Sequence, residues 1–174
     1  MDLIKLSMAA AFISERTHLT WREVQFGIEN ELLDPRAAID LVVDELAAQE
    51  SPSSTLLELA TCGMDEPVQG LVKQLANAEL EPLADEIRDK WLFLVLSWIY
   101  LHKDSYRDPL RVVEEVYADF GYPERIAGFI RYMPTEEPDL GSREQNERRL
   151  YEKWRRYLDQ ASTAYLPKHA VGSV

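Results

Sequence analysis

Three carboxylates in one predicted helix are the first residues with a chemistry suited to catalysis. Glu114, Glu115 and Asp119 lie within DPLRVVEEVYADFGYPERIAGFIRYMP, residues 108–134. Acids on one helix face can act as general acid and base where burial shifts a pKa towards neutrality. The apolar stripe of this helix lies on another face, formed by Leu110, Val113, Val116, Tyr117 and Phe120. We therefore expect the three acids to face water, with Glu115 paired to Arg111.

No other set of residues indicates a reaction. His18, His102 and His169 are scattered along the chain, and the Glu-x-x-His spacing that di-iron bundles use twice occurs here once, at Glu15. The G-x-S-x-G, P-loop and G-x-G-x-x-G motifs are absent from the sequence. The single cysteine, Cys62, ends an apolar run, which is typical of a core or turn residue. The sequence thus predicts no catalytic residue, no metal site and no cofactor.

Helix start signals recur along the chain. They are a capping box at Thr20, Asp-Pro starts at Asp34 and Asp108, and a second capping box at Ser142. No segment alternates convincingly between apolar and polar residues as a half-buried strand would. The sequence predicts an all-α fold of about eight helices, in an irregular orthogonal bundle or a short solenoid-like stack.

We expect one helical domain over residues 1–166, closed by a charged helix over residues 142–165. A disordered tail over residues 167–174 is expected to follow. The first residues, MDLIKLSMAAAFISER, have an early acid and short apolar runs, which predict a first helix instead of a secretory signal.

The most apolar stretch predicts a buried helix. WLFLVLSWIYL, residues 91–101, is 11 residues long, whereas a membrane span needs about 20. We expect its core positions to be Trp91, Leu94, Val95 and Trp98. With no membrane segment and a lone cysteine, the sequence predicts a cytoplasmic protein.

Charge is distributed unevenly along the chain. The net charge is −12, and residues 1–100 contribute 18 acidic against 7 basic residues, whereas residues 101–174 contribute 13 against 12. An acidic field of this kind repels nucleic acid and anionic membranes and favours a basic partner. It also keeps a protein soluble, which is the simpler interpretation.

The predicted last helix combines bases with aromatic residues in RRLYEKWRRYLDQ, residues 148–160. Tyr151, Trp154 and Tyr157 fall on one inward stripe at helical spacing. Residues 143–159 hold six basic and four acidic side chains. We expect this helix to dock against the acidic half of its own domain, and we do not expect it to bind nucleic acid.

Two segments resemble a known bacterial family. They are TWREVQFGIENELLDPRAAIDLVVDEL and KWLFLVLSWIYLHKDSYRDPLRVVEEVYADFGYPERIAGFIRYMP, and the likeness spans about residues 19–134. They resemble domain-of-unknown-function family 2247, in which YRDPLRVVEEVYADFGYPE followed by RYMP is the more specific part. The resemblance supplies no catalytic residue. It implies a small cytoplasmic bacterial protein, and the company of some members suggests the immunity type that accompanies toxin systems.

The leading hypothesis from the sequence is therefore a non-enzymatic binding protein that occludes a basic toxin domain. The residues expected to carry the contact are exposed acids of the second and third helices: Glu29, Glu31, Asp40, Asp44 and Glu45. Two alternatives remain, an enzyme whose site is assembled from distant residues and a subunit of a larger assembly. The sequence assigns no oligomeric state.

Overall fold

The regular elements of the described part of the chain are all helices. The computed structural model describes residues 5–48, 50–63, 67–81 and 83–166, so the expected tail over 167–174 lies outside the described residues. No strand occurs in these ranges, which confirms the all-α prediction. The elements are α1 (Ala10–Ser14), α2 (Trp21–Glu29), α3 (Ala37–Ala48), α4 (Ser54–Ala60), α5 (Val68–Ala78), α6 (Ala84–Leu101), a 3-10 turn (Lys103–Ser105), α7 (Pro109–Asp119), α8 (Glu124–Ala127) and α9 (Arg143–Tyr165).

Three of the four start signals begin helices where the sequence predicted them. The Thr20 capping box is complete, and the side chains of Asp108 and Ser142 accept hydrogen bonds from the backbones of the first turns of α7 and α9. The signal at Asp34 differs, because its carboxylate accepts the Arg36 N–H at 2.8 Å. This bond closes a turn, and α3 begins only at Ala37.

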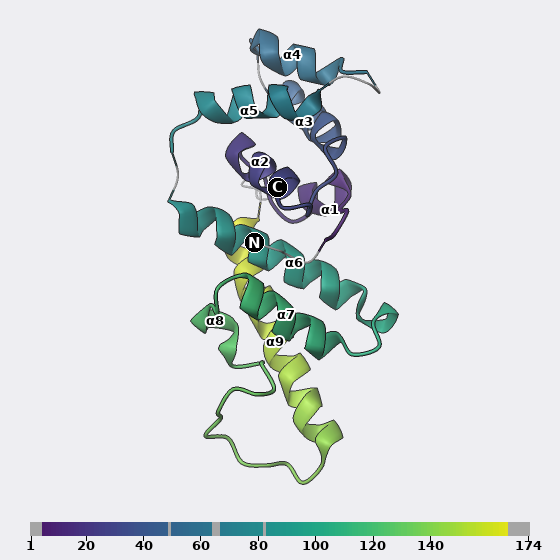
Figure 1. Cartoon of the computed structure of the whole chain (residues 1–174), viewed down its shortest axis with the longest axis vertical. Coiled ribbons are helices and arrows are strands. Elements are labelled where there is room, and N and C mark those ends of the chain that lie inside the picture. The colour runs from purple at the N-terminus through teal and green to yellow at the C-terminus, as the bar shows by residue number, and fades with distance from the viewer. Residues whose placement is uncertain (1–4, 49, 64–66, 82, 167–174) are drawn as a thin grey trace, which may run out of the picture.

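The helices are arranged around α6, with α1 to α5 on one side and α7 and α8 on the other (Figure 1). The long helix α9 also packs on α6. The main partner of α2 is α5, while α3 packs on α4 and α4 on α5. A solenoid would stack each helix pair on the next one along the chain. The described fold is thus an irregular bundle.

The start of α2 is completed from a distant part of the chain. The backbone N–H groups of Trp21 and Arg22 donate to the two carboxylate oxygens of Glu79 at 2.8 and 2.9 Å. The Arg22 side chain in turn donates to the Glu79 carbonyl at 3.1 Å. Because the first N–H groups of a helix have no partner within the helix, Glu79 satisfies two of them.

The buried helix predicted from the apolar stretch is α6. Trp91, Leu94 and Val95 are fully buried, and every residue from Trp91 to Ser97 is buried. Trp98 was expected in the core but is only partly buried. Its ring packs between two other rings, with centroid distances of 5.0 Å to Phe12 and 4.2 Å to His102.

Trp91 fixes the crossing of α2 and α6. Its indole N–H donates to the Glu23 carbonyl at 2.8 Å, and its ring fills the space beside Gly27. One residue earlier on α6, Lys90 pairs with the buried Glu23 carboxylate at 2.7 Å. The two helices therefore meet through one aromatic ring, one glycine and one largely buried ion pair.

Gly27→Ala should destabilise the protein, because the new methyl group would overlap Cζ2 and Cη2 of Trp91. We expect the free energy of unfolding to fall by about 1–3 kcal/mol, as in other overpacked cores. Urea denaturation followed by circular dichroism measures it.

The matched control is Gly70→Ala in α5, where an added methyl group meets no atom within 4 Å. Here alanine should raise the free energy of unfolding by about 0.5–1 kcal/mol, since glycine is the poorer helix former. Equal effects of the two substitutions would contradict the assigned crossing of α2 and α6.

Candidate functional site

The acids predicted to bind a partner are divided between α2 and α3. Glu29, at the end of α2, is exposed and accepts a hydrogen bond from Gln25 at 2.6 Å. Glu31 follows in the turn and pairs with Lys5 at 2.6 Å, with both side chains mostly exposed. These acids therefore lie where a partner could reach them.

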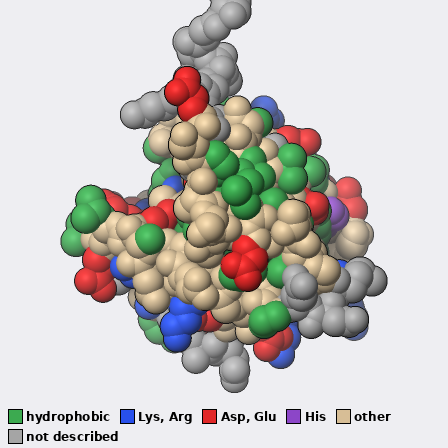
Figure 2. All heavy atoms as spheres, turned by 90° about the horizontal axis from the view of Figure 1, so that it is seen from above, with side chains coloured by type: hydrophobic (Ala, Val, Ile, Leu, Met, Phe, Trp, Pro, Cys, Tyr) green, Lys and Arg blue, Asp and Glu red, His purple; other side chains and the backbone are tan. Residues whose placement is uncertain are grey.

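The other predicted acids lie on α3. Asp40 is exposed in its first turn, and Glu45 is half-buried and has interactions of its own. The side chain of Asp44 lies outside what the structure describes. The set is therefore spread over the end of α2, the following turn and α3. Viewed from the α4 end, acidic side chains are spread over this face, with apolar groups between them (Figure 2).

A second charged region is centred on Arg131, after α8. Its guanidinium donates to both oxygens of Glu114, with Nε–Oε1 at 2.8 Å and Nη2–Oε2 at 3.3 Å. It also donates from Nη1 to Asp108 at 2.9 Å and lies 3.8 Å from Glu147. One arginine thus joins the start of α7, its middle and the first turns of α9.

The arrangement follows from local sequence. Asp108 caps α7 by accepting the Arg111 N–H at 3.1 Å, which fixes its carboxylate at the helix start. The chain then reverses after α7 at Gly121 and Tyr122, both of which have positive φ. This reversal brings Arg131 back beside Glu114 and Asp108.

The expectation of three solvated acids on α7 is wrong for Glu114. Its side chain is only 20% exposed and is held by Arg131. Glu115 behaves as predicted, because it is 58% exposed and pairs with Arg111 at 3.4 Å. Asp119 is half-buried and has interactions of its own. The three acids therefore occupy three different environments.

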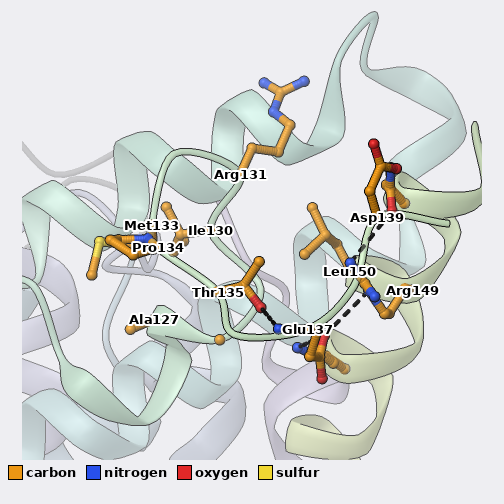
Figure 3. Close-up of a pocket in the computed structure, with 13 residues that line it drawn as sticks. Ala127, Ile130, Arg131, Met133, Pro134, Thr135, Glu137, Asp139, Arg149 and Leu150 are labelled. Carbon is orange, nitrogen blue, oxygen red and sulfur yellow. Dashed lines mark hydrogen bonds and ion pairs between the residues drawn. The ribbon is translucent and has the colours of Figure 1, made fainter. Parts of the chain in front are cut away.

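The bases of α9 pair mainly with nearby acids. The predicted stripe is confirmed, since Trp154 is fully buried and α9 packs on α6. The helix docks on α6, which belongs to the acidic half, but Arg149 and Lys153 do not take their partners from that half. Both pair with Glu137, at 3.2 and 2.6 Å, in the loop that precedes α9 (Figure 3). The hydrogen bond from Lys153 lowers the pKa of the Glu137 carboxyl.

A groove runs along α9 between this loop and the start of α7. It consists of three adjoining cavities of about 450, 490 and 290 Å³ that share lining residues. We call it the α9 groove; its charged lining residues are Arg107, Asp108, Arg111, Arg131, Glu137, Asp139, Arg143, Glu147, Arg149 and Lys153. These are six basic and four acidic side chains, so the lining is positive although the whole chain is acidic.

Neither a metal site nor a membrane-spanning helix is indicated by the residues that the structure describes. Among the described residues, no group of three or more His, Cys, Asp or Glu side chains could hold a metal ion. His169 lies outside those residues. In the same described ranges, no helix has the length and apolar character to cross a membrane.

The fold and these surfaces define an all-helical bundle with an acidic first half and a charged groove along its last helix. Over residues 9–162 the chain matches the family described as "Uncharacterized protein conserved in bacteria (DUF2247)", and it belongs to that family. The match extends beyond residues 19–134 at both ends and includes most of α9. No curated protein and no solved structure matches the chain.

Glu114→Gln should lower the free energy of unfolding by about 1–2 kcal/mol, because it leaves the Arg131 guanidinium short of its main partner. Glu115→Gln, one residue later, should cost about 0.5 kcal/mol or less, because exposed ion pairs contribute little. Chemical denaturation of the two variants makes the comparison. Equal costs would show that Glu114 is a solvated acid after all.

Asp108→Asn should reveal the pH dependence of this network. Burial acts to raise the pKa of Asp108, but the Arg111 N–H and the Arg131 guanidinium outweigh it, and the pKa lies below its ordinary 3.8. A lowered pKa stabilises the fold above the unfolded value, and this contribution is lost as the pH falls through the folded value. Asparagine can still cap α7, so the variant isolates the charge.

At pH 7 we expect Asp108→Asn to be less stable than the wild type by about 0.5–1.5 kcal/mol. The difference should shrink below pH 3.8, where the wild-type carboxyl becomes protonated. Urea melts between pH 7 and pH 3 measure it. A difference that is independent of pH would contradict the pairing with Arg131.

Proposed function

We propose that this protein is a non-enzymatic binding protein which acts in the cytoplasm by covering a basic surface of another protein. Residues 1–100 provide the binding face. In the immunity role that the family resemblance implied, the partner is a toxin domain and the two proteins bind in a fixed ratio. Such an inhibitor needs no catalytic residue.

The observation that carries this proposal is the difference in ion pairing between the two halves. In the second half, seven acids of α7 and its cap, the following loop and α9 pair with arginine or lysine, and among the described residues the exposed acids without such a pair are fewer: Asp104, Glu124, Glu136, Asp139 and Glu152. In the first half, several exposed acids have no ion pair with any described residue: Glu29, Asp40, Glu58, Glu81, Asp85 and Glu86. Their charge is therefore directed to solvent and to an approaching partner.

Apolar side chains on the same helices supply a second requirement of a binding face. Val43 on α3 is 58% exposed and Leu57 on α4 is 48% exposed. Their helices pack on each other. In protein interfaces, apolar anchors provide much of the affinity, while charges at the rim mainly accelerate association.

Charge reversal tests the steering role. Glu29→Lys with Asp40→Lys should slow association with a basic protein domain encoded beside this chain by about tenfold at 0.01 M salt. The effect should weaken at 0.15 M, where the Debye length has contracted from about 30 Å to about 8 Å. Stopped-flow fluorescence separates the association and dissociation rates.

The matched control is Glu144→Lys with Glu152→Lys, two exposed positions on α9 outside the acidic half. It makes the same change in net charge and should alter the association rate by less than about twofold. If neither salt nor either double variant changes the association rate, the acidic face does not steer a partner and serves only to keep the protein soluble.

A further inference from the structure

The α9 groove differs in charge from the rest of the molecule. Its lining is positive by two charges, whereas the chain carries −12. Its two ends also differ from each other. One end contains Arg149 and Lys153, and the other contains Arg107, Arg111 and Arg143.

At the Lys153 end, the groove already holds an acidic segment of the chain itself, residues 137–139. Lys153 binds the Glu137 carboxylate at 2.6 Å, and Arg149 donates to the Pro138 carbonyl at 2.8 Å. Asn146 donates to the Asp139 carboxylate at 2.7 Å. Side chains of α9 thus bind two carboxylates and one backbone carbonyl from three successive residues, and Figure 3 shows this end of the groove.

At the other end, the cations are much less neutralised. Arg107 is exposed and makes no ion pair with any described residue. Arg111 has only the 3.4 Å contact with Glu115, and its side chain is 73% exposed. Arg143 pairs with Glu147 at 2.8 Å but remains 81% exposed. Exposed ion pairs contribute about 0–1 kcal/mol, so an anionic ligand could replace these contacts at small cost.

We propose that the α9 groove binds an acidic, extended peptide segment of a partner protein, with its carboxylates on Arg107, Arg111 and Arg143. A guanidinium presents a planar pair of donors that matches a carboxylate. The segment from Glu137 to Asp139 shows the same chemistry at the neighbouring end of the groove. This site is separate from the acidic face and does not depend on the function proposed for it.

Two features favour a peptide over a nucleic acid. Asp108 and Glu147 line the groove among the arginines. Peptide N–H groups can donate to these carboxylates, whereas the phosphodiester backbone offers only acceptors, which carboxylates repel. A long polyanion would also extend beyond the groove into the field of a chain whose net charge is −12, whereas a peptide needs to present only a few carboxylates to the groove.

The test measures binding of a fluorescein-labelled ten-residue peptide in which glutamate alternates with serine. Fluorescence anisotropy at about 0.05 M salt follows binding, where screening is moderate. The wild-type protein should bind this peptide at least about tenfold more tightly than the same peptide with glutamine in place of glutamate. Tripolyphosphate and a ten-nucleotide single-stranded DNA serve as competing probes.

Two double variants locate the site. Arg107→Gln with Arg143→Gln should weaken binding at least about tenfold, since each removes a charge-assisted hydrogen bond. The control, Arg148→Gln with Arg155→Gln, removes the same charge from exposed positions of α9 that do not line the groove. It should change binding by less than about twofold. Arg107→Glu alone, at an unpaired surface position, should also weaken binding without affecting the fold.

Three results would overturn the proposal. The first is absence of wild-type binding up to about 1 mM peptide, which corresponds to only about 4 kcal/mol of binding free energy. The second is equal weakening by the two double variants, which would mean that net charge alone drives binding. The third is tighter binding of the DNA or of tripolyphosphate than of the peptide, which would assign the groove to phosphate ligands.

Discussion

The close approach of α2 and α6 at Gly27 and Trp91 is the constraint on which the rest of the bundle depends. A ring as large as indole can be fully buried at this crossing because the facing residue has no side chain. The indole N–H finds its acceptor in the Glu23 carbonyl, so the burial leaves no unpaired donor there. With α6 fixed on α2, its other side becomes the surface on which α7 and α9 pack.

The two sides of α6 handle charge in different ways. On the side of α1 to α5, Glu23 is buried with Lys90, while many other acids remain at the surface without a cation. On the side of α7 to α9, arginines gather carboxylates from several segments, as Arg131 does with Glu114 and Asp108. One fold thus presents an unneutralised acidic surface and a nearly neutral one with a locally positive groove. The two surfaces would therefore attract ligands of opposite charge.

The sequence correctly predicted features that depend only on residues close together in the chain. The Asp108 cap and the Trp154 stripe each depend on local spacing, and both are present. The second role of Asp108, as a partner of Arg131, joins positions 23 residues apart and could not be read from one helix. Arg131 stood within the family motif RYMP, but helical periodicity assigns no partner to a residue in a turn. The groove likewise appears only when the loop before α9 has folded back onto that helix.

The contact of Glu79 with the start of α2 has a consequence for local unfolding of the first half. Two amides of α2 depend on a carboxylate at the end of α5, 57 and 58 residues further along the chain. Opening of α5 would therefore expose the amide protons of Trp21 and Arg22 to exchange with solvent, even if the turns of α2 stayed intact. The two helices should behave as one cooperative unit whose protection against hydrogen exchange is gained and lost together.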